Sequence, residues 1–91
     1  MSLQEEFKAA QGSVKNLAST PTSDELLTLY ALYKQATEGD AHGKRPGMLD
    51  VKGRFKYDAW TKQKGTSRDH AMQQYNEMVA RLTKHYGKSA T

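Results

Sequence analysis

Residues 22–39 of the chain, TSDELLTLYALYKQATEG, decide the fold class because they contain an amphipathic helix with both of its end signals. Thr22 and Glu25 have the spacing of a capping box, which marks the start of a helix. Leucines, tyrosines and alanines then recur at helical intervals. Gly39 can supply the left-handed residue that ends the helix. The segment therefore predicts a helix that begins at Thr22 and ends before Gly39.

A first helix is predicted upstream of this segment. Its apolar residues recur at spacings of three and four and form one stripe on a helix. These residues are Leu3, Phe7, Ala10, Val14 and Leu17. The helix should end before Pro21, because proline disfavours the helical conformation in the residue that precedes it.

Two more helices are predicted after the loop that follows Gly39. Asp50 can cap the third helix, and the Gly-Thr-Ser sequence at 65–67 breaks it and offers caps for a fourth. The fourth extends to Tyr86, and we expect residues 87–91 to fray. No segment shows the alternation of a β-strand. Four amphipathic helices in a chain of 91 residues predict an all-α four-helix bundle.

The size and composition of the chain limit what it can be. A length of 91 residues allows one domain, 1–91, with an ordered core at about 4–87. The mean hydropathy is −0.87, and no apolar run is long enough to span a membrane. The first six residues do not read as a secretion signal. The chain has no cysteine, which excludes disulfides and thiol chemistry. We expect a cytoplasmic protein.

The net charge of +4 is unevenly distributed. Residues 34–68 contain nine basic and four acidic side chains and have a net charge of +5, whereas residues 1–33 have a net charge of −2. The middle third is therefore where an anion would bind, although a stretch of one sign is more often a solvated face.

The sequence lacks the usual signatures of catalysis and metal binding. His42, His70 and His85 are not at metal-ligand spacing. The segment 39–45 resembles a phosphate-binding loop, but it has one residue too few between its glycines and Arg45 in place of the Ser or Thr that binds magnesium. No nucleophile is paired with a base. We therefore expect neither an enzyme nor a metal site nor a bound cofactor.

Aromatic and basic residues share one face of the second predicted helix. Leu27, Tyr30, Tyr33 and Lys34 fall within about a third of the helix circumference. One interpretation is that the tyrosines are core residues with their hydroxyls at the rim and that Lys34 extends to solvent along them. The other is that this face binds a ligand, with rings for stacking and an ammonium for an anion.

Similar mixtures occur on the third and fourth predicted helices. Lys52 and Lys56 are i,i+4 neighbours with Phe55 beside them, which by itself also fits a solvated basic stripe. Tyr75 lies on the apolar stripe of the fourth helix and by itself fits an ordinary core position. Taken together, the three helices favour a ligand with an aromatic base, phosphates and an apolar part.

Three segments of the sequence closely resemble the acyl-CoA-binding protein family. They are LYALYKQATEGD at 29–40, RPGMLDVKG at 45–53 and KYDAW at 56–60, where Tyr57 replaces the family's usual Trp. The resemblance covers residues 4–87. It implies an up-down-down-up four-helix bundle that carries long-chain fatty acyl-CoA thioesters in the cytosol and forms a pool of them without catalysis. It also implies a monomer with transient contacts to membranes or to acyl-CoA-using enzymes.

The resemblance further implies roles for individual residues. Tyr30, Lys34 and Lys56 would hold the ribose 3′-phosphate of CoA, with Tyr33 against the adenine. The remaining head-group residues would be Tyr75, which lines the site, Lys15 and Lys52 at its charged margin, and Ala31 and Leu32, which serve mainly in packing. The acyl chain would be sheltered by Leu26, Leu27, Val51 and Phe55.

A basic helical module that binds nucleic acid is the alternative from another class. Such a module would need Arg and Lys spread along one exposed helix. In this chain the basic residues alternate with tyrosines, and arginine is scarcer than lysine. We therefore expect no nucleic-acid partner.

Overall fold

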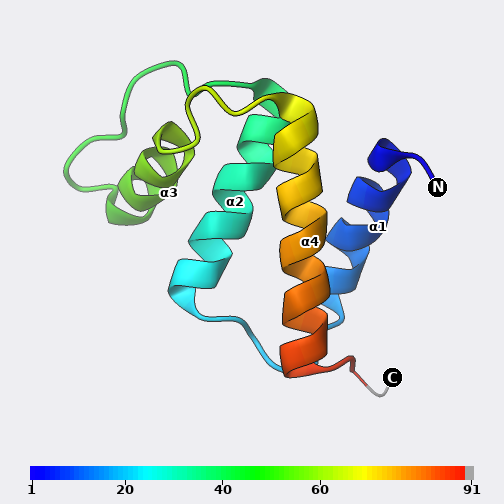
Figure 1. The fold of residues 1–91 in the computed structure, drawn as a ribbon. Helices are drawn as coiled ribbons and strands as arrows, with labels where there is room; N and C mark the ends of the chain where they lie inside the picture. Colours follow the sequence, from blue (N-terminus) through cyan, green and yellow to red (C-terminus); the bar gives the residue numbers. More distant parts are fainter. Residues whose placement is uncertain (90–91) are drawn as a thin grey trace.

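The structure, a computed structural model, describes residues 1–89 and contains four helices within them (Figure 1). They are α1 (Leu3–Lys15), α2 (Ser23–Glu38), α3 (Val51–Thr61) and α4 (Arg68–Tyr86). The predicted all-α class is confirmed. None of the helices in this part of the chain is long and apolar enough to cross a membrane.

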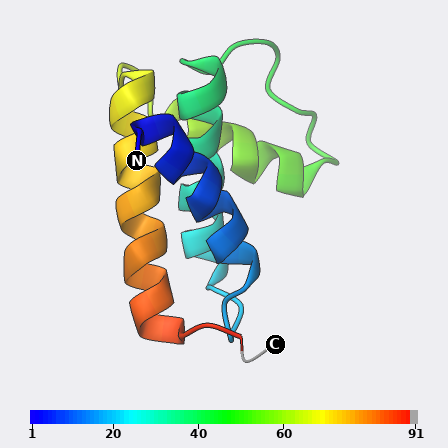
Figure 2. The ribbon, with the colours of Figure 1, turned by 90° about the vertical axis from the view of Figure 1, so that its right-hand side faces the viewer.

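The helices follow the up-down-down-up order. Helices α1 and α4 run in one direction, and α2 and α3 run in the other (Figures 1 and 2). Helix α4 packs against both α1 and α2, whereas α3 packs against α2 alone. Figure 2 shows α3 lying across α2 on the side away from α1. Helix α2 is therefore the element that joins the three-helix part of the bundle to α3.

The helix starts are set by the residues that the sequence indicated. The Thr22 hydroxyl accepts a hydrogen bond from the backbone of Glu25, and the Glu25 carboxylate accepts one from the backbone of Thr22, which confirms the capping box. Asp50 and Ser67 cap α3 and α4 through their side chains, as predicted. Gly39 ends α2 with a φ of 79°, in the region that favours glycine.

The hydrophobic core lies between α1, α2 and α4. It contains Phe7, Ala10, Leu29, Leu32, Ala36, Ala71, Tyr75, Met78, Val79 and Leu82. Helix α3 buries only Trp60 fully. Its other large apolar residues do not form the buried stripe of an ordinary amphipathic helix, since Val51 is 55% exposed and Phe55 is 58% exposed.

Two expectations at the chain ends were wrong. Leu17 was placed on the stripe of the first helix, but α1 ends at Lys15 and Leu17 forms an isolated β-bridge with Lys88. Residues 87–89 were expected to fray, yet the Ala18 N–H donates to the Gly87 carbonyl and the Ser89 N–H donates to the Asn16 carbonyl. The pairing of these two segments satisfies backbone groups that fraying would leave to water. Residues 90–91, the rest of that expectation, lie outside the described residues.

A buried amide joins three segments at one end of the molecule. Gln35, which is only 1% exposed, donates through Nε2 to Asp40 Oδ1 at 2.8 Å and to the Thr66 carbonyl at 2.7 Å. Asp40 Oδ1 also accepts from the Gly65 N–H at 2.9 Å. These bonds, with the Gly65 bond first, lower the pKa of Asp40. They connect α2, the loop that follows it and the linker between α3 and α4.

A side-chain hydrogen bond joins the start of α2 to the end of α4. The Tyr86 hydroxyl donates to Glu25 Oε1 at 2.6 Å. This bond, followed by the one from the Thr22 backbone, lowers the pKa of Glu25. Because the folded pKa is below the unfolded value of about 4.3, the stabilisation is present above that pH. It is lost as the pH falls through the folded pKa.

We expect Tyr86→Phe to lower the melting temperature at pH 7 by a few degrees, because the ring is kept but the hydrogen bond to a carboxylate is lost. The difference from the wild type should shrink as the pH falls below the ordinary glutamate pKa of about 4.3 and through the lower folded pKa of Glu25. Calorimetry from pH 7 to the acid limit of folding measures both effects.

The matched control is Tyr57→Phe, since the Tyr57 hydroxyl donates to the neutral carbonyl of Gly43. Its effect on stability should not depend on pH in this range. An equal pH dependence in both variants would contradict the assignment to Glu25.

Candidate functional site

A cavity of about 1120 Å³ opens between α2 and α3. This volume is slightly above the usual range for small-molecule sites. The side chains that line it come from the first half of α2, from α3 and from the two residues that follow α3. They are Ser23, Asp24, Leu26, Leu27, Thr28, Tyr30, Ala31, Lys52, Phe55, Lys56, Asp58, Ala59, Lys62 and Gln63.

The floor of the cavity is apolar and accessible to water. Leu26 and Phe55 are exposed there, and Leu27 is half-buried. A ligand that covers these side chains removes apolar surface from water, which is favourable by roughly 25 cal/mol for each Å². Val51 is exposed at the start of α3 but does not line the cavity. The structure therefore brings together three of the four predicted groove residues.

Basic side chains from α3 border the same cavity. Lys52, Lys56 and Lys62 line it, and Lys56 Nζ is 5.3 Å from the centroid of the Tyr30 ring on α2, a cation–π distance. Asp58 also lines the cavity, but Arg45 donates to both of its carboxylate oxygens, at 2.9 and 2.8 Å. This pairing lowers the pKa of Asp58. The charge left at the border is positive.

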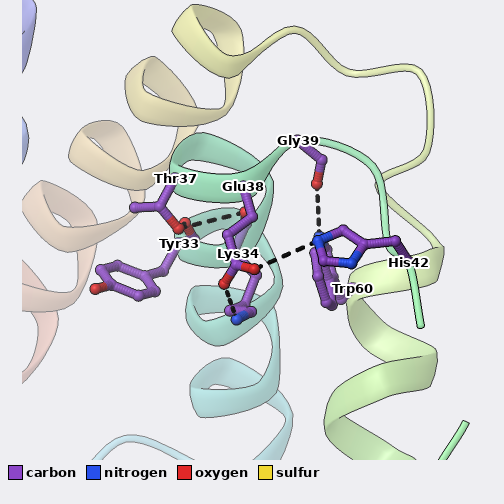
Figure 3. A network of polar contacts seen from close by, with 7 residues as sticks. All are labelled: Tyr33, Lys34, Thr37, Glu38, Gly39, His42 and Trp60. Atoms are coloured by element: carbon purple, nitrogen blue, oxygen red, sulfur yellow. Dashed lines mark hydrogen bonds and ion pairs between the residues drawn. The ribbon is translucent and has the colours of Figure 1, made fainter. Parts of the chain in front are cut away.

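Lys34 lies beyond the cavity, one turn after Tyr30, in a network of polar contacts (Figure 3). Its ammonium forms an ion pair with Glu38 and is 4.8 Å from the centroid of the Trp60 ring. The Trp60 indole N–H donates to the Gly39 carbonyl at 2.8 Å, which fixes that ring against the end of α2. The hydrogen bond to Glu38 raises the pKa of Lys34 and lowers that of Glu38.

Tyr33 points to the opposite side of α2 from Trp60 (Figure 3). Its ring stacks on Phe7 at a centroid distance of 6.0 Å and remains 38% exposed. Phe7 also contacts the buried ring of Tyr75, edge to face at 5.0 Å. Burial raises the pKa of Tyr75. Tyr75 therefore occupies a core position, whereas Tyr30 is half-buried and Tyr33 is exposed, although one interpretation placed both of these in the core with their hydroxyls at the rim.

The remaining predicted site residues differ in how far their side chains are exposed to solvent. Ala31 and Leu32 are buried, and Leu32 belongs to the core, consistent with their expected packing role. Lys15 is the exposed last residue of α1. Lys56 of α3 reaches the ring of Tyr30 on α2, and Lys34 of α2 reaches the ring of Trp60 on α3, so Tyr30 and Lys34 both lie on the side of α2 that contacts α3.

The sequence reasoning missed the surroundings of Lys34. Glu38 could have been found, because opposite charges at i and i+4 on a helix are neighbours. Trp60 had no local signal, since 26 positions separate it from Lys34 in the sequence. In the part of the chain that the structure describes, no three His, Cys, Asp or Glu side chains are grouped as metal ligands would be.

Comparisons with known proteins find relatives of this chain by sequence and by fold. A sequence model of the acyl CoA binding protein family matches residues 4–79. The acyl-CoA-binding protein homolog of Manduca sexta is 51% identical over 83 residues, which cover 90% of this chain and 92% of that protein. The homolog from Drosophila melanogaster is 48% identical over 84 residues, which cover 92% and 98% of the two chains.

Solved structures of similar proteins have the same architecture. The crystal structure of Oryza sativa Acyl-CoA-Binding Protein 2 superposes with a TM-score of 0.88 at 40% identity and covers 92% of this chain and 93% of that one. The crystal structure of ACBP from Moniliophthora perniciosa superposes with a TM-score of 0.84 at 38% identity and covers 97% and 86%.

Proposed function

Because this chain belongs to the acyl-CoA-binding protein family, we propose that it binds long-chain fatty acyl-CoA thioesters and carries them without catalysis. The observation that carries the proposal is the cavity between α2 and α3, which combines an apolar floor with a border of lysines and a tyrosine. An acyl-CoA has matching parts, a hydrocarbon tail and a head group with several phosphates.

The head group would bind where α2 faces α3. Tyr30, Lys34 and Lys56 would donate to the ribose 3′-phosphate, because an ammonium or a phenol forms charge-assisted hydrogen bonds with a phosphate. Tyr33, whose ring is partly exposed, would contact the adenine. The other head-group residues would be Tyr75, Lys15, Lys52, Ala31 and Leu32.

The acyl chain would cover the apolar floor. Leu26, Leu27 and Phe55 line that part of the cavity, and the exposed Val51 lies one turn before Phe55 on the same helix. Each CH₂ group withdrawn from water contributes about 0.8 kcal/mol. A long chain would therefore contribute much more to affinity than the thioester or a short chain.

We expect a long-chain acyl-CoA such as dodecanoyl-CoA to bind at least about a thousandfold more tightly than free CoA, because half a dozen covered CH₂ groups contribute about 4–5 kcal/mol. Dodecanoate should bind weakly as well, since it lacks the head group. Isothermal titration calorimetry with the three ligands measures the differences. Equal affinity for dodecanoyl-CoA and CoA would remove the acyl groove from the proposal.

The role of Lys34 can be tested with the 3′-dephospho form of dodecanoyl-CoA. The wild type should bind this form about two to four orders of magnitude more weakly, because hydrogen bonds to charged groups contribute about 1.5–3 kcal/mol each. Lys34→Ala should largely erase the difference. Lys44→Ala, which removes the same charge from the loop after α2, should preserve it. If Lys34→Ala and Lys44→Ala changed this difference in affinity by the same amount, general electrostatic attraction alone would explain the preference for the phosphate.

We propose that the protein acts as a cytoplasmic monomer that exchanges its ligand in transient contacts with membranes or acyl-CoA-using enzymes. A suitable contact point lies just before α3, where Met48 and the fully exposed Leu49 follow each other in a turn. The turn is closed by a hydrogen bond from the Asp50 N–H to the Gly47 carbonyl at 3.0 Å. Apolar residues beside lysines suit the surface of an anionic bilayer.

We expect Leu49→Ser to slow the transfer of dodecanoyl-CoA from vesicles to the protein by up to about tenfold, because it removes an apolar group that would enter the lipid surface. Affinity for the ligand in solution should not change. Stopped-flow transfer from vesicles with and without phosphatidylserine measures the effect. An unchanged transfer rate would contradict a membrane contact through this turn.

A further inference from the structure

The ammonium of Lys34 already has an anionic partner within its own helix. Glu38, one turn further along α2, forms an ion pair with Lys34 through Oε2. Its other oxygen, Oε1, is 3.4 Å from Nε2 of His42 in the following loop. Figure 3 shows the carboxylate between the two basic groups, with Trp60 behind them. The position that a phosphate would take at Lys34 is therefore next to a carboxylate.

We propose that Glu38 competes with the 3′-phosphate of the ligand for Lys34 and so sets the strength of its selection for that phosphate. The inference rests on the proposed function, because it takes acyl-CoA as the ligand and Lys34 as a partner of its phosphate. It adds a residue outside the head-group set, and that residue acts against binding.

The surroundings of Lys34 leave its ammonium little freedom to avoid the competition. The Lys34 side chain is 21% exposed, and its ammonium lies over the Trp60 ring. That ring is in turn held by its hydrogen bond to the Gly39 carbonyl. A phosphate must therefore meet Lys34 where Glu38 already contacts it. Either the carboxylate leaves, or two anions share one ammonium and repel each other.

His42 offers the displaced carboxylate a second partner. Because Glu38 presents different oxygens to Lys34 and to His42, it can lose the first contact and keep the second. The groups that face Glu38 are thus Lys34 from α2 and His42 from the loop, with the uncharged Trp60 of α3 next to both. Lys34 is the main cause of the lowered pKa of Glu38, and His42 is a smaller one.

If Glu38 competes with the phosphate, the effect of neutralising Glu38 on affinity should depend on the ligand. Neutralising Glu38 should favour only ligands that place a phosphate at Lys34. A ligand without the 3′-phosphate does not displace the carboxylate, so its affinity should not increase when Glu38 is neutralised. A general increase in positive charge, by contrast, would favour every CoA derivative to the same degree.

The experiment compares Glu38→Gln with the wild type by calorimetry, using dodecanoyl-CoA and its 3′-dephospho form. We expect the variant to bind dodecanoyl-CoA about two- to fivefold more tightly, the range that follows from the strength of partly exposed ion pairs. Affinity for the dephospho ligand should change by less than about 1.5-fold. Glu77→Gln, the same neutralisation at an exposed position of α4, is the matched control and should change the affinity for neither ligand.

A second measurement follows the carboxylate itself. In wild-type protein with ¹³C-labelled glutamate, dodecanoyl-CoA should raise the pKa of Glu38 toward its ordinary range, because the carboxylate loses Lys34 and gains a phosphate as its neighbour. The dephospho ligand should leave the pKa of Glu38 low. This readout needs no substitution and would not move if Glu38 only stabilised the helix.

The outcomes separate the inference from the proposed function. Tight binding of dodecanoyl-CoA by the wild type, together with no gain or an equal gain for both ligands in Glu38→Gln, would overturn the competition and keep the carrier function. A loss of affinity in this variant would do the same, since it would make Glu38 a supporting group. If the wild type bound no dodecanoyl-CoA, the proposed function would fail and the inference with it.

Discussion

The position of α3 depends on the buried amide of Gln35. Helix α3 packs against α2 alone, so it cannot be held by the core that joins the other three helices. Gln35 instead bonds to Asp40 on one side of α3 and to Thr66 on the other, and Asp40 also accepts from Gly65. Because an unpaired buried amide N–H is costly, these bonds hold both ends of the segment that contains α3 against α2.

The two sides of α2 have different neighbours. Leu29, Leu32 and Ala36 pack into the core with α1 and α4. Tyr30 and Lys34 face α3, where they meet Lys56 and Trp60. Tyr30 and Lys34 can therefore stay partly exposed without weakening the core. Because only one side of α2 belongs to the core, apolar residues of α3 can be exposed while the core residues stay buried.

Much of this protein was determined by the sequence itself, because the signals involved are local. Thr22, Asp50 and Ser67 start helices through bonds to residues three positions ahead, and the apolar spacing of α2 and α4 gives their buried faces. The positive charge of residues 34–68 indicated an anionic ligand, and the resemblance carried by 29–40, 45–53 and 56–60 indicated the ligand class and the candidate residues. The signal at the C-terminal end of α1 was weaker, and there the expectation for Leu17 was wrong.

Only the tertiary structure decided which side chains meet. The pairing of Leu17 with Lys88, the contact of Lys34 with Trp60 and the closure of Gln35 onto Thr66 join positions far apart in the sequence. The exposure of Phe55 has the same origin, since periodicity describes a helix face but not the cavity that opens beside it. Burial and long-range contacts depend on how the helices pack, and a linear pattern does not contain that information.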